Sequence, residues 1–203
     1  MYLNPQFQLT KLKKQYVAQN RERVYIVGIR NDLVDKDNTK KKWNWDWYDE
    51  LLDGTSNEYK TDPTVVRDIM EDPNSPAVLE SVITSQQWSK LKDIHSKRNG
   101  IGDAYINPNQ KAPTLISSYK RTGNHTSKFI GTERDGTNND IPRFLTPREC
   151  LRIMGFPEEF YAPSISKDGT NATAHFYAGI GNAVVPQVIS SIGKELGKCL
   201  PNN

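Results

Sequence analysis

Long apolar runs, a secretion signal and a cysteine framework are all missing from this chain of 203 residues. Without a run of about eighteen apolar residues, no segment could cross a membrane as a helix. The amino terminus lacks the apolar core of a signal peptide, which argues against secretion. The two cysteines, Cys150 and Cys199, lie far apart and match neither a metal-binding spacing nor a disulfide framework. We therefore expect a cytoplasmic protein with no membrane partner and no bound metal.

Hydrophobic residues are also scarce, at 35% of the chain, which predicts extensive polar loops around one domain or slightly more. The net charge of +3 conceals an uneven distribution. Residues 1–42 hold ten basic against four acidic residues, residues 43–82 hold two against ten, and residues 83–135 hold nine against four. The two basic segments are candidate faces for nucleic-acid binding, because phosphates need local positive potential. Solvated loops of mixed charge explain the pattern equally well.

Local patterns predict two strands and an early helix. The β-branched run at residues 24–29 predicts a buried strand, and residues 114–119 predict a second, short one. Asp62 stands directly before Pro63, and this pair is typical of a helix start. We therefore expect a helix from Pro63 to about residue 70.

Three further helices are predicted in the rest of the chain. Thr146 and Glu149 form a capping box with a proline between them, and Gly155 is expected to end the helix that they begin. Apolar residues at helical spacing predict a helix at residues 85–97 and a final one at residues 188–196.

Three sequence blocks follow one another in a recognisable order. The first is a Gln-x-Arg-x-Arg pattern at residues 19–23, the second runs from Arg143 to Pro157, and the third is Gly-Asn-Ala-Val-Val-Pro at residues 181–186. In this order the blocks resemble motifs VIII, IX and X, the last three motifs of DNA (cytosine-5) methyltransferases. Three ordered matches are far more specific than any single one. The chain begins almost at the first block, so we expect the front half of such an enzyme to be absent.

The resemblance implies the fold and its division. We expect an α+β chain that is the C-terminal portion of an α/β S-adenosylmethionine-dependent methyltransferase fold, with a loop-rich target recognition domain and a returning C-terminal helix. Residues 1–33 would be a remnant of the catalytic domain. Residues 34–175 would form the target recognition domain, including motif IX. Residues 176–203 would hold motif X and the helix that packs back on the catalytic domain.

The two arginines of the first block are the expected catalytic residues. The reaction holds a cytosine outside the duplex while its ring gains negative charge, and a guanidinium offers a permanent charge and a rigid fork of donors. The resemblance implies that Arg23 contacts the flipped cytosine and that Arg21 orients the site. Two exposed arginines at the start of a strand are the ordinary alternative. The family usually has Tyr-Gly-Val-Pro before the glutamine, whereas this chain has Tyr-Val-Ala at residues 16–18.

Duplex contacts are expected from the first block and from the segment between the first two blocks. A Thr-Leu pair begins at Thr114, where the family's target recognition domain has the same dipeptide. Basic side chains and small polar residues after it are suited to phosphate and groove contacts. The DNA-binding candidates are Gln19, Thr114, Lys120, Arg121 and Lys128.

The third block offers two interpretations. Residues 177–181 resemble the glycine-rich loop that binds S-adenosyl-L-methionine at the start of these enzymes. Such a loop needs a helix, a second strand and an acidic residue after it, and only 22 residues follow Gly181. We therefore assign the block to motif X. The resemblance then implies that Asn182 and Ala183 lie at the rim of a cofactor pocket that the absent half mainly builds.

The family's nucleophile has no counterpart in this chain. A cysteine directly after proline would attack the cytosine, but Cys150 follows Glu149 and Cys199 follows Lys198. The Glu-Asn pair that protonates the ring is missing as well. Cys150 lies among apolar neighbours in an expected helix, which favours a buried structural thiol. We therefore expect a second polypeptide to carry the N-terminal motifs.

The expected function is that of the C-terminal half, or subunit, of a DNA (cytosine-5) methyltransferase of a restriction-modification system. The assembled enzyme would transfer a methyl group from S-adenosyl-L-methionine to carbon 5 of cytosine in a specific sequence of double-stranded DNA. The main alternative is a catalytically inactive DNA-binding remnant of a decayed methylase. A relative that methylates RNA is a third, weaker alternative.

Overall fold

The computed structural model describes residues 17–21, 23, 25–28, 65–97, 104–120, 127–132, 141–163 and 171–199. One 3-10 helix and five α-helices lie in these segments. They are η2 (Val66–Ile69), α2 (Pro76–Glu80), α3 (Ser85–Ser96), α4 (Pro147–Ile153), α5 (Asn171–Asn182) and α6 (Pro186–Cys199). None of the helices in the described segments is long and apolar enough to cross a membrane.

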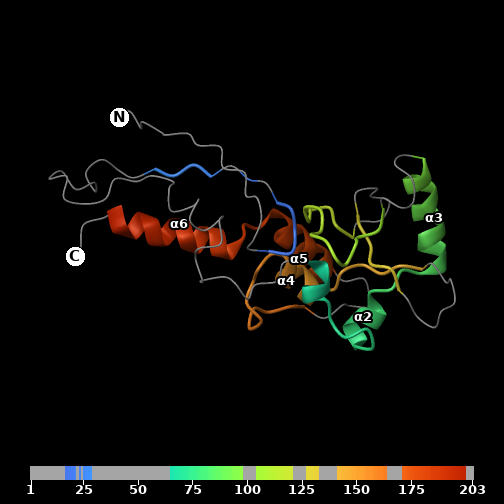
Figure 1. Cartoon of the computed structure of the whole chain (residues 1–203). Helices are drawn as coiled ribbons and strands as arrows, with labels where there is room; N and C mark the ends of the chain where they lie inside the picture. The colour runs from blue at the N-terminus through green and yellow to red at the C-terminus, as the bar shows by residue number, and fades with distance from the viewer. Residues whose placement is uncertain are drawn as a thin grey trace.

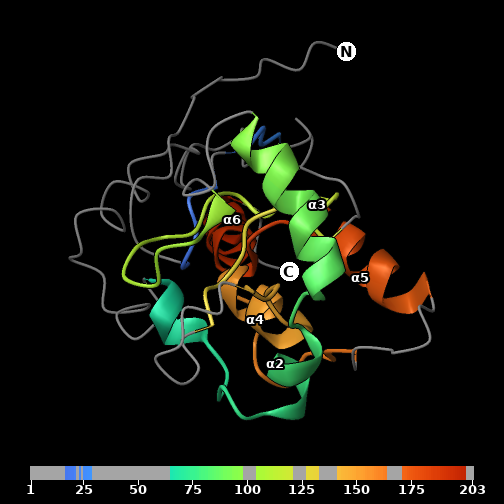
Figure 2. The same ribbon diagram turned by 90° about the vertical axis from the view of Figure 1, so that its right-hand side faces the viewer.

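The helices are spread along an elongated molecule. Figure 1 shows α3 at one end and α6 at the other, with α4 and α5 between them. After a rotation of 90°, α3 lies in front of α6, while α4 remains near the centre (Figure 2). Near the centre, the short α4 packs against α5 and η2.

Helix starts follow the expected capping chemistry. The Thr146 hydroxyl accepts a hydrogen bond from the Glu149 amide, and the Glu149 carboxylate accepts one from the Thr146 amide, which confirms the capping box of α4. Thr84 and Gln87 form a second capping box at α3, which confirms the helix expected at residues 85–97. Gly155, with φ of 77°, ends α4 in the left-handed conformation that favours glycine.

Short backbone bridges take the place of long strands in the described segments. Ile106 donates to the Phe129 carbonyl at 2.8 Å, and Ile130 and Arg143 exchange two hydrogen bonds of 2.9 Å each. Ile83 in turn donates to the carbonyl of Pro142. These contacts align four extended pieces of chain side by side. Together they form an irregular ladder of backbone hydrogen bonds in the loop-rich centre of the molecule.

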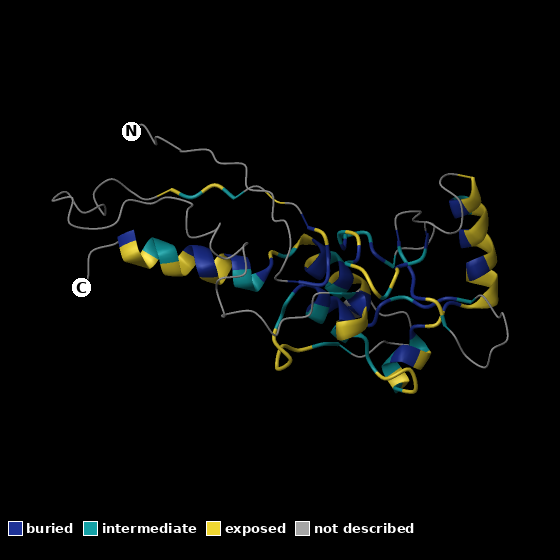
Figure 3. Ribbon diagram, in the orientation of Figure 1, coloured by how far each residue is buried: buried dark blue, intermediate teal, exposed yellow. Residues whose placement is uncertain are grey.

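Two hydrophobic clusters flank this ladder. The larger one surrounds α4 and α5, and its fully buried members include Leu151, Met154 and Tyr177. The smaller one lies under α3, where Trp88 packs edge-on against Phe129. Figure 3 shows the same division, with buried residues in α4 and on the inner side of α3 and exposed residues on its outer side.

Both expected strands are absent from the described residues. Tyr25 to Gly28 form no strand and Ile26 is 70% exposed, so the buried strand at residues 24–29 is wrong for the part that is described. A strand needs a neighbour with which to pair its amides and carbonyls, and the described segments provide none there. The segment at 114–119 is extended only at its start and then turns over residues 117–120.

Two helical expectations also change. The helix expected from Pro63 begins later, as the 3-10 helix at Val66, because Val65 is extended with φ of −132° and ψ of 164°. Asp62 and Pro63 themselves lie outside the described residues. The glycine-rich residues 177–181 belong to the end of α5 and form no loop. The expected domain boundary between residues 175 and 176 therefore falls inside a helix, and the division into domains stays a prediction.

The last helix confirms the expectation for residues 188–196 and extends it at both ends. Pro186 occupies its first position, where the missing amide hydrogen costs nothing. Val188 and Ile192 are buried, whereas Ile189 is 41% exposed. The helix therefore has one covered and one open side, which is visible as the alternation of dark and yellow in Figure 3.

Candidate functional site

Hydrogen bonds join the first block to residues 112–116, which contain Thr114 and Leu115 and are called the Thr-Leu segment from here on. Gln19 and Ala112 form a parallel bridge, in which Ala112 donates to the Ala18 carbonyl and Asn20 donates to the Ala112 carbonyl, each at 2.8 Å. The Thr114 hydroxyl then donates to the carbonyl of Asn20. Two segments that lie more than ninety residues apart in the sequence thus run side by side.

Arg21 lies at the centre of the site and joins all three parts of it. Its side chain is only 5% exposed. One terminal nitrogen, Nη1, donates to the Leu115 carbonyl at 2.9 Å. The other, Nη2, donates to the carbonyls of Gly181 at 2.9 Å and Ala183 at 2.7 Å. A single guanidinium therefore holds the Thr-Leu segment against the end of α5.

Arg23 has a different environment from Arg21. Arg21 is buried, whereas Arg23 is exposed, so the two side chains do not share one environment as neighbours on a strand face would. Burial, followed by repulsion from Arg23, lowers the pKa of the Arg21 guanidinium. Arg21 is therefore a buried structural residue, and Arg23 is a surface residue.

Gln19 reinforces the same junction from inside. It is 3% exposed, its amide nitrogen donates to the Ile153 carbonyl at 3.1 Å, and its amide oxygen accepts from the Leu115 amide at 3.1 Å. This placement differs from the surface position that a direct DNA contact requires. Gln19 instead connects the end of α4 to the Thr-Leu segment.

Gly181 allows α5 to approach the Thr-Leu segment closely. A Cβ atom at this position would lie 2.3 Å from the Ile116 carbonyl carbon and 2.5 Å from the Ser117 amide nitrogen. Both are backbone atoms, which cannot move aside like the end of a flexible side chain. Only glycine therefore permits the carbonyl of residue 181 to reach the Arg21 guanidinium.

We expect Gly181→Ala to lower the free energy of unfolding by about 1–3 kcal/mol, the usual cost of forcing extra atoms into a packed site. Gly179 is the matched control, since it lies in the same helix and a Cβ atom added there would meet no atom within 4 Å. There, Gly179→Ala should raise the free energy of unfolding by about 0.5–1 kcal/mol, because alanine restricts the unfolded chain. Denaturant unfolding of both variants tests this, and a stabilising Gly181→Ala would contradict the close approach.

The remaining DNA-binding candidates are placed unequally. Thr114 is half-buried at the junction, and Lys128 is half-buried in the segment that enters the ladder at Phe129. The ammonium of Lys120 lies over two aromatic rings, 5.3 Å from the centroid of Tyr177 and 5.8 Å from that of Phe144. Arg121 lies outside the described residues. The DNA contacts of these side chains stay predictions.

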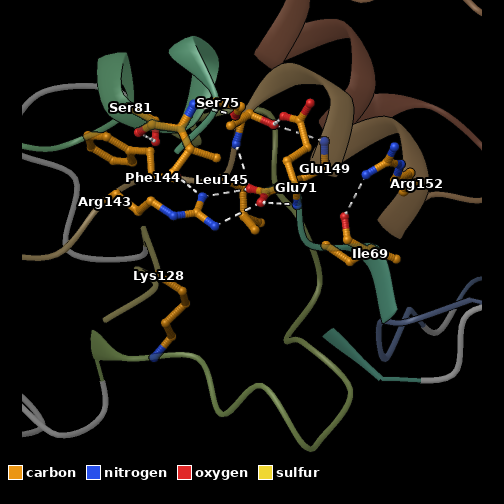
Figure 4. A network of polar contacts seen from close by, with 12 residues as sticks. Ile69, Glu71, Ser75, Ser81, Lys128, Arg143, Phe144, Leu145, Glu149 and Arg152 are labelled. Carbon is orange, nitrogen blue, oxygen red and sulfur yellow. Dashed lines mark hydrogen bonds and ion pairs between the residues drawn. The ribbon is translucent and has the colours of Figure 1, made fainter. Parts of the chain in front are cut away.

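The second block contains a buried ion pair that orders the centre of the molecule. Arg143 and Glu149 are 3% and 0% exposed, and they pair through two hydrogen bonds of 2.7 and 2.8 Å. Glu149 also accepts hydrogen bonds from the amides of Glu71 and Thr146. Figure 4 shows this network between α4 and the segment that precedes α2.

Arg148 and Arg152 of α4 act on nearby protein groups. Arg152 pairs with Glu158 at 2.6 Å and donates to the Ile69 carbonyl at 3.3 Å. Hydrogen bonding to Glu158 raises the pKa of Arg152. Arg148 lies 3.9 Å from the same carboxylate. Both arginines therefore tie α4 to Glu158, and Arg152 also ties it to the end of η2.

Cys150 is fully buried, as expected for a structural thiol. Burial raises the pKa of this thiol well above its usual value. A protonated thiol in the core is a poor nucleophile. The position therefore has the properties of a packing residue.

The two cofactor candidates end α5 beside the Arg21 guanidinium. Asn182 is exposed, and Ala183 is half-buried with its carbonyl bonded to Arg21. Arg21 Nε is buried and has no hydrogen-bond partner among the described residues. The Asn182 side chain is open to a ligand, whereas Arg21 Nε lies beneath the surface. These residues are thus compatible with the rim of a cofactor pocket.

Several contributors to the site were not found from the sequence. Leu115 and Gly181 act through backbone carbonyls, which any residue type possesses. The partner of Glu149 was also missed, although an arginine six residues before a capping-box glutamate was available as a signal. The role of Glu71, which accepts from the Thr146 hydroxyl, has no sequence signal at all.

Comparison with known proteins gives a consistent set of matches. A family model described as C-5 cytosine-specific DNA methylase matches residues 4–198. Type II methyltransferase M.DsaV of Dactylococcopsis salina is 30% identical over 185 residues, which are 89% of this chain and 44% of the relative. Type II methyltransferase M.Bsp6I of a Bacillus species is 28% identical over 188 residues, 91% of this chain and 51% of the relative. The chain thus spans about half the length of these relatives, or less.

Two solved structures share the fold at 17% identity. The Dnmt2 methyltransferase of S. pombe matches with a TM-score of 0.53, over 79% of this chain and 50% of its own. A DNMT2 variant of Spodoptera frugiperda matches with a TM-score of 0.51, over 89% of this chain and 54% of its own. The methyltransferase fold expected from the sequence is confirmed at this level. The recognition domain and the returning helix stay predictions.

Proposed function

Because this chain belongs to the C-5 cytosine-specific DNA methylase family, we propose that it supplies the target recognition and base-holding portion of a DNA (cytosine-5) methyltransferase. The observation that carries this proposal is the Arg21 junction. One buried guanidinium bonds to Leu115 in the Thr-Leu segment and to Gly181 and Ala183 in the third block. Three parts of the chain with separate expected tasks would thereby act as one unit.

In this proposal, Arg21 positions the chain, and Arg23 contacts the substrate. Arg21 is buried and spends its terminal nitrogens on backbone carbonyls, which fixes the chain that leads to Arg23. Arg23 lies two residues further on and is exposed, so its guanidinium is accessible to a base. A fixed positive charge beside the ring would stabilise the negative charge that develops during methyl transfer. Burial of the flipped cytosine would strengthen this effect.

Duplex binding in this proposal comes from Thr114, Arg121 and Lys128, on and near the Thr-Leu segment. The basic residues would contact phosphates, and small polar groups would reach base edges. Gln19 would support this surface from behind, since its amide bonds to Leu115 and Ile153. The contacts of Lys120 argue for a separate role, which is taken up below.

S-adenosyl-L-methionine is the cofactor that the family uses. Asn182 and Ala183 would border its pocket, beside the junction that Arg21 holds through the Ala183 carbonyl. The cofactor supplies the methyl group when bound. The described residues would contribute only a rim, so the main cofactor loop, the nucleophile and the general acid would come from the other part of the enzyme.

Exposed apolar side chains suit the proposal that another part of the enzyme covers this chain. Ile26 is 70% exposed, Val184 is 48% exposed, and Ile189 on α6 is 41% exposed. Where such side chains form one contiguous patch, that patch typically marks an interface. We propose that the part of the enzyme that carries the Pro-Cys nucleophile covers it, as a second polypeptide.

Methyl transfer tests this proposal directly. The purified chain alone should transfer no labelled methyl group from S-adenosyl-L-methionine to duplex DNA, because it contains no Pro-Cys nucleophile. Addition of a polypeptide that is encoded beside it and carries Pro-Cys and the cofactor loop should restore transfer. A cytosine-free duplex is the control for specific labelling.

Two results would contradict the proposal. Methyl transfer by the purified chain alone would require a different nucleophile. Duplex binding without transfer in the presence of the completing polypeptide would favour the inactive DNA-binding remnant.

A further inference from the structure

Lys120 has an unusual backbone conformation. Its φ of 65° is in the left-handed region, and it is the only described residue other than glycine with a positive φ. This conformation is unfavourable for a side chain with a Cβ atom and persists where the surroundings fix it. The position closes the turn at residues 117–120. The surroundings of Lys120 should therefore explain why the chain turns here.

The side chain of Lys120 is directed inward. Its ammonium lies 5.3 Å from the ring centroid of Tyr177 on α5 and 5.8 Å from that of Phe144 in the second block. Both distances are within the range of a cation–π interaction. Burial lowers the pKa of this ammonium. A phosphate contact would instead need the charge at the surface.

Hydrogen bonds fasten the chain on both sides of Lys120. The Lys120 amide donates to the Ser127 hydroxyl at 3.3 Å. The Tyr119 hydroxyl donates to the Lys128 carbonyl at 3.0 Å and accepts from the Leu145 amide at 2.8 Å. Residues 119–120 and 127–128 are thus tied to each other and to the second block. The contact of the Lys120 ammonium with Tyr177 connects these residues to α5 as well.

We propose that Lys120 is a positioning residue that sets sequence preference by holding the recognition segment, residues 114–120 and 127–130, against α5 and the second block. This inference rests on the proposed function. The charge of Lys120 would act on the rings of Phe144 and Tyr177. Lys128, on the same segment, would contact phosphate. Thr114 and Lys128 would then meet the duplex in one fixed register. A change at Lys120 would disturb the choice of sequence and leave the number of phosphate contacts intact.

Selection from a pool of duplexes with randomised central base pairs tests this assignment. The full chain and its variants are incubated with the pool, and the bound fraction is sequenced. The salt dependence of affinity is measured on the duplex that the unmodified chain prefers. Lys120→Met should reduce enrichment of the preferred sequence about tenfold and leave the salt slope unchanged. Lys120→Arg keeps a cation over the rings and should restore the enrichment.

Lys128→Met is the variant with the opposite signature. It should lower the salt slope by about one and leave the enriched sequence unchanged. Loss of about one unit of slope in Lys120→Met, with unchanged enrichment, would overturn our assignment and identify Lys120 as a phosphate contact. Identical behaviour of Lys120→Met and the unmodified chain would overturn it as well.

If the unmodified chain enriches no sequence, either alone or with the completing polypeptide, the proposed function fails, and amide hydrogen exchange tests the anchor by itself. Lys120→Met should speed exchange of the Leu145 and Lys120 amides about tenfold, and Lys120→Arg should reverse this. Unchanged exchange in a folded Lys120→Met chain would show that the contacts with Phe144 and Tyr177 hold nothing in place.

Discussion

Glu149→Gln is expected to lower the free energy of unfolding by about 3–5 kcal/mol, the usual cost of leaving one partner of a buried ion pair without the other. Glu149 is fully buried and bonds to both terminal nitrogens of Arg143 at 2.7 and 2.8 Å. Glutamine has nearly the same shape but no charge, so the Arg143 guanidinium would remain buried without a counter-charge. Denaturant unfolding, followed by circular dichroism, measures the loss.

Glu158→Gln is the matched control. Glu158 also pairs with an arginine through two hydrogen bonds, those from Arg152, but it is 61% exposed. Exposed ion pairs contribute about 0–1 kcal/mol because water solvates both partners after the pair is broken. The same chemical change should therefore have a much smaller effect at position 158. Equal losses for the two variants would contradict the burial argument.

Replacement of both partners shows how much of the loss comes from leaving one buried charge unpaired. An Arg143→Met and Glu149→Leu double variant removes both charges and leaves an apolar interior. We expect it to be more stable than Glu149→Gln, because no unpaired charge remains. The amides of Glu71 and Thr146 would still lose their acceptor, so full recovery is not expected.

Arg23→Ala is expected to reduce turnover of the assembled enzyme by about 100–1000-fold, the usual effect of removing one group that stabilises transition-state charge. Duplex affinity should remain mostly intact, since the proposed contact is with the flipped base. Because Arg23 is exposed, its removal should change the free energy of unfolding by less than about 0.5 kcal/mol. Single-turnover methyl transfer and denaturant unfolding measure the two effects.

Arg21→Ala provides the contrast. Its guanidinium donates to three backbone carbonyls, and hydrogen bonds from charged groups contribute about 1.5–3 kcal/mol each. We therefore expect a loss of stability of about 3 kcal/mol or more together with loss of turnover. If Arg23→Ala keeps its full rate, or if it destabilises the chain as strongly as Arg21→Ala, the division of roles between the two arginines is wrong.

Features with a local cause could be predicted from the sequence. The start of α4 depends on Thr146 and Glu149, three residues apart, and its end depends on Gly155. Both are recognisable because capping chemistry acts within one turn of a helix. The buried thiol of Cys150 follows from the same helix. The ordered blocks also predict the family, since each is a contiguous run of residues.

Features that depend on distant partners were missed or placed wrongly. The run at residues 24–29 has the composition of a strand, but a strand also needs a neighbour, and composition does not provide one. The sequence shows Gly181 only as part of a block, because its close approach to Ile116 depends on three-dimensional packing. Lys120 is expected to contact DNA from its place after the Thr-Leu pair, whereas its ammonium lies over the rings of Phe144 and Tyr177, which come from other segments.

The Arg21 junction has a consequence for the order of events during synthesis. Arg21 is made well before its acceptors, which lie 94, 160 and 162 residues later in the sequence. Contacts of such long range form only after the entropy of closing the intervening loop has been overcome. A ribosome therefore completes most of the chain before the guanidinium meets Gly181 and Ala183. Products that stop before the end of α5 lack the Gly181 and Ala183 carbonyls, so a chain terminated there cannot assemble this site.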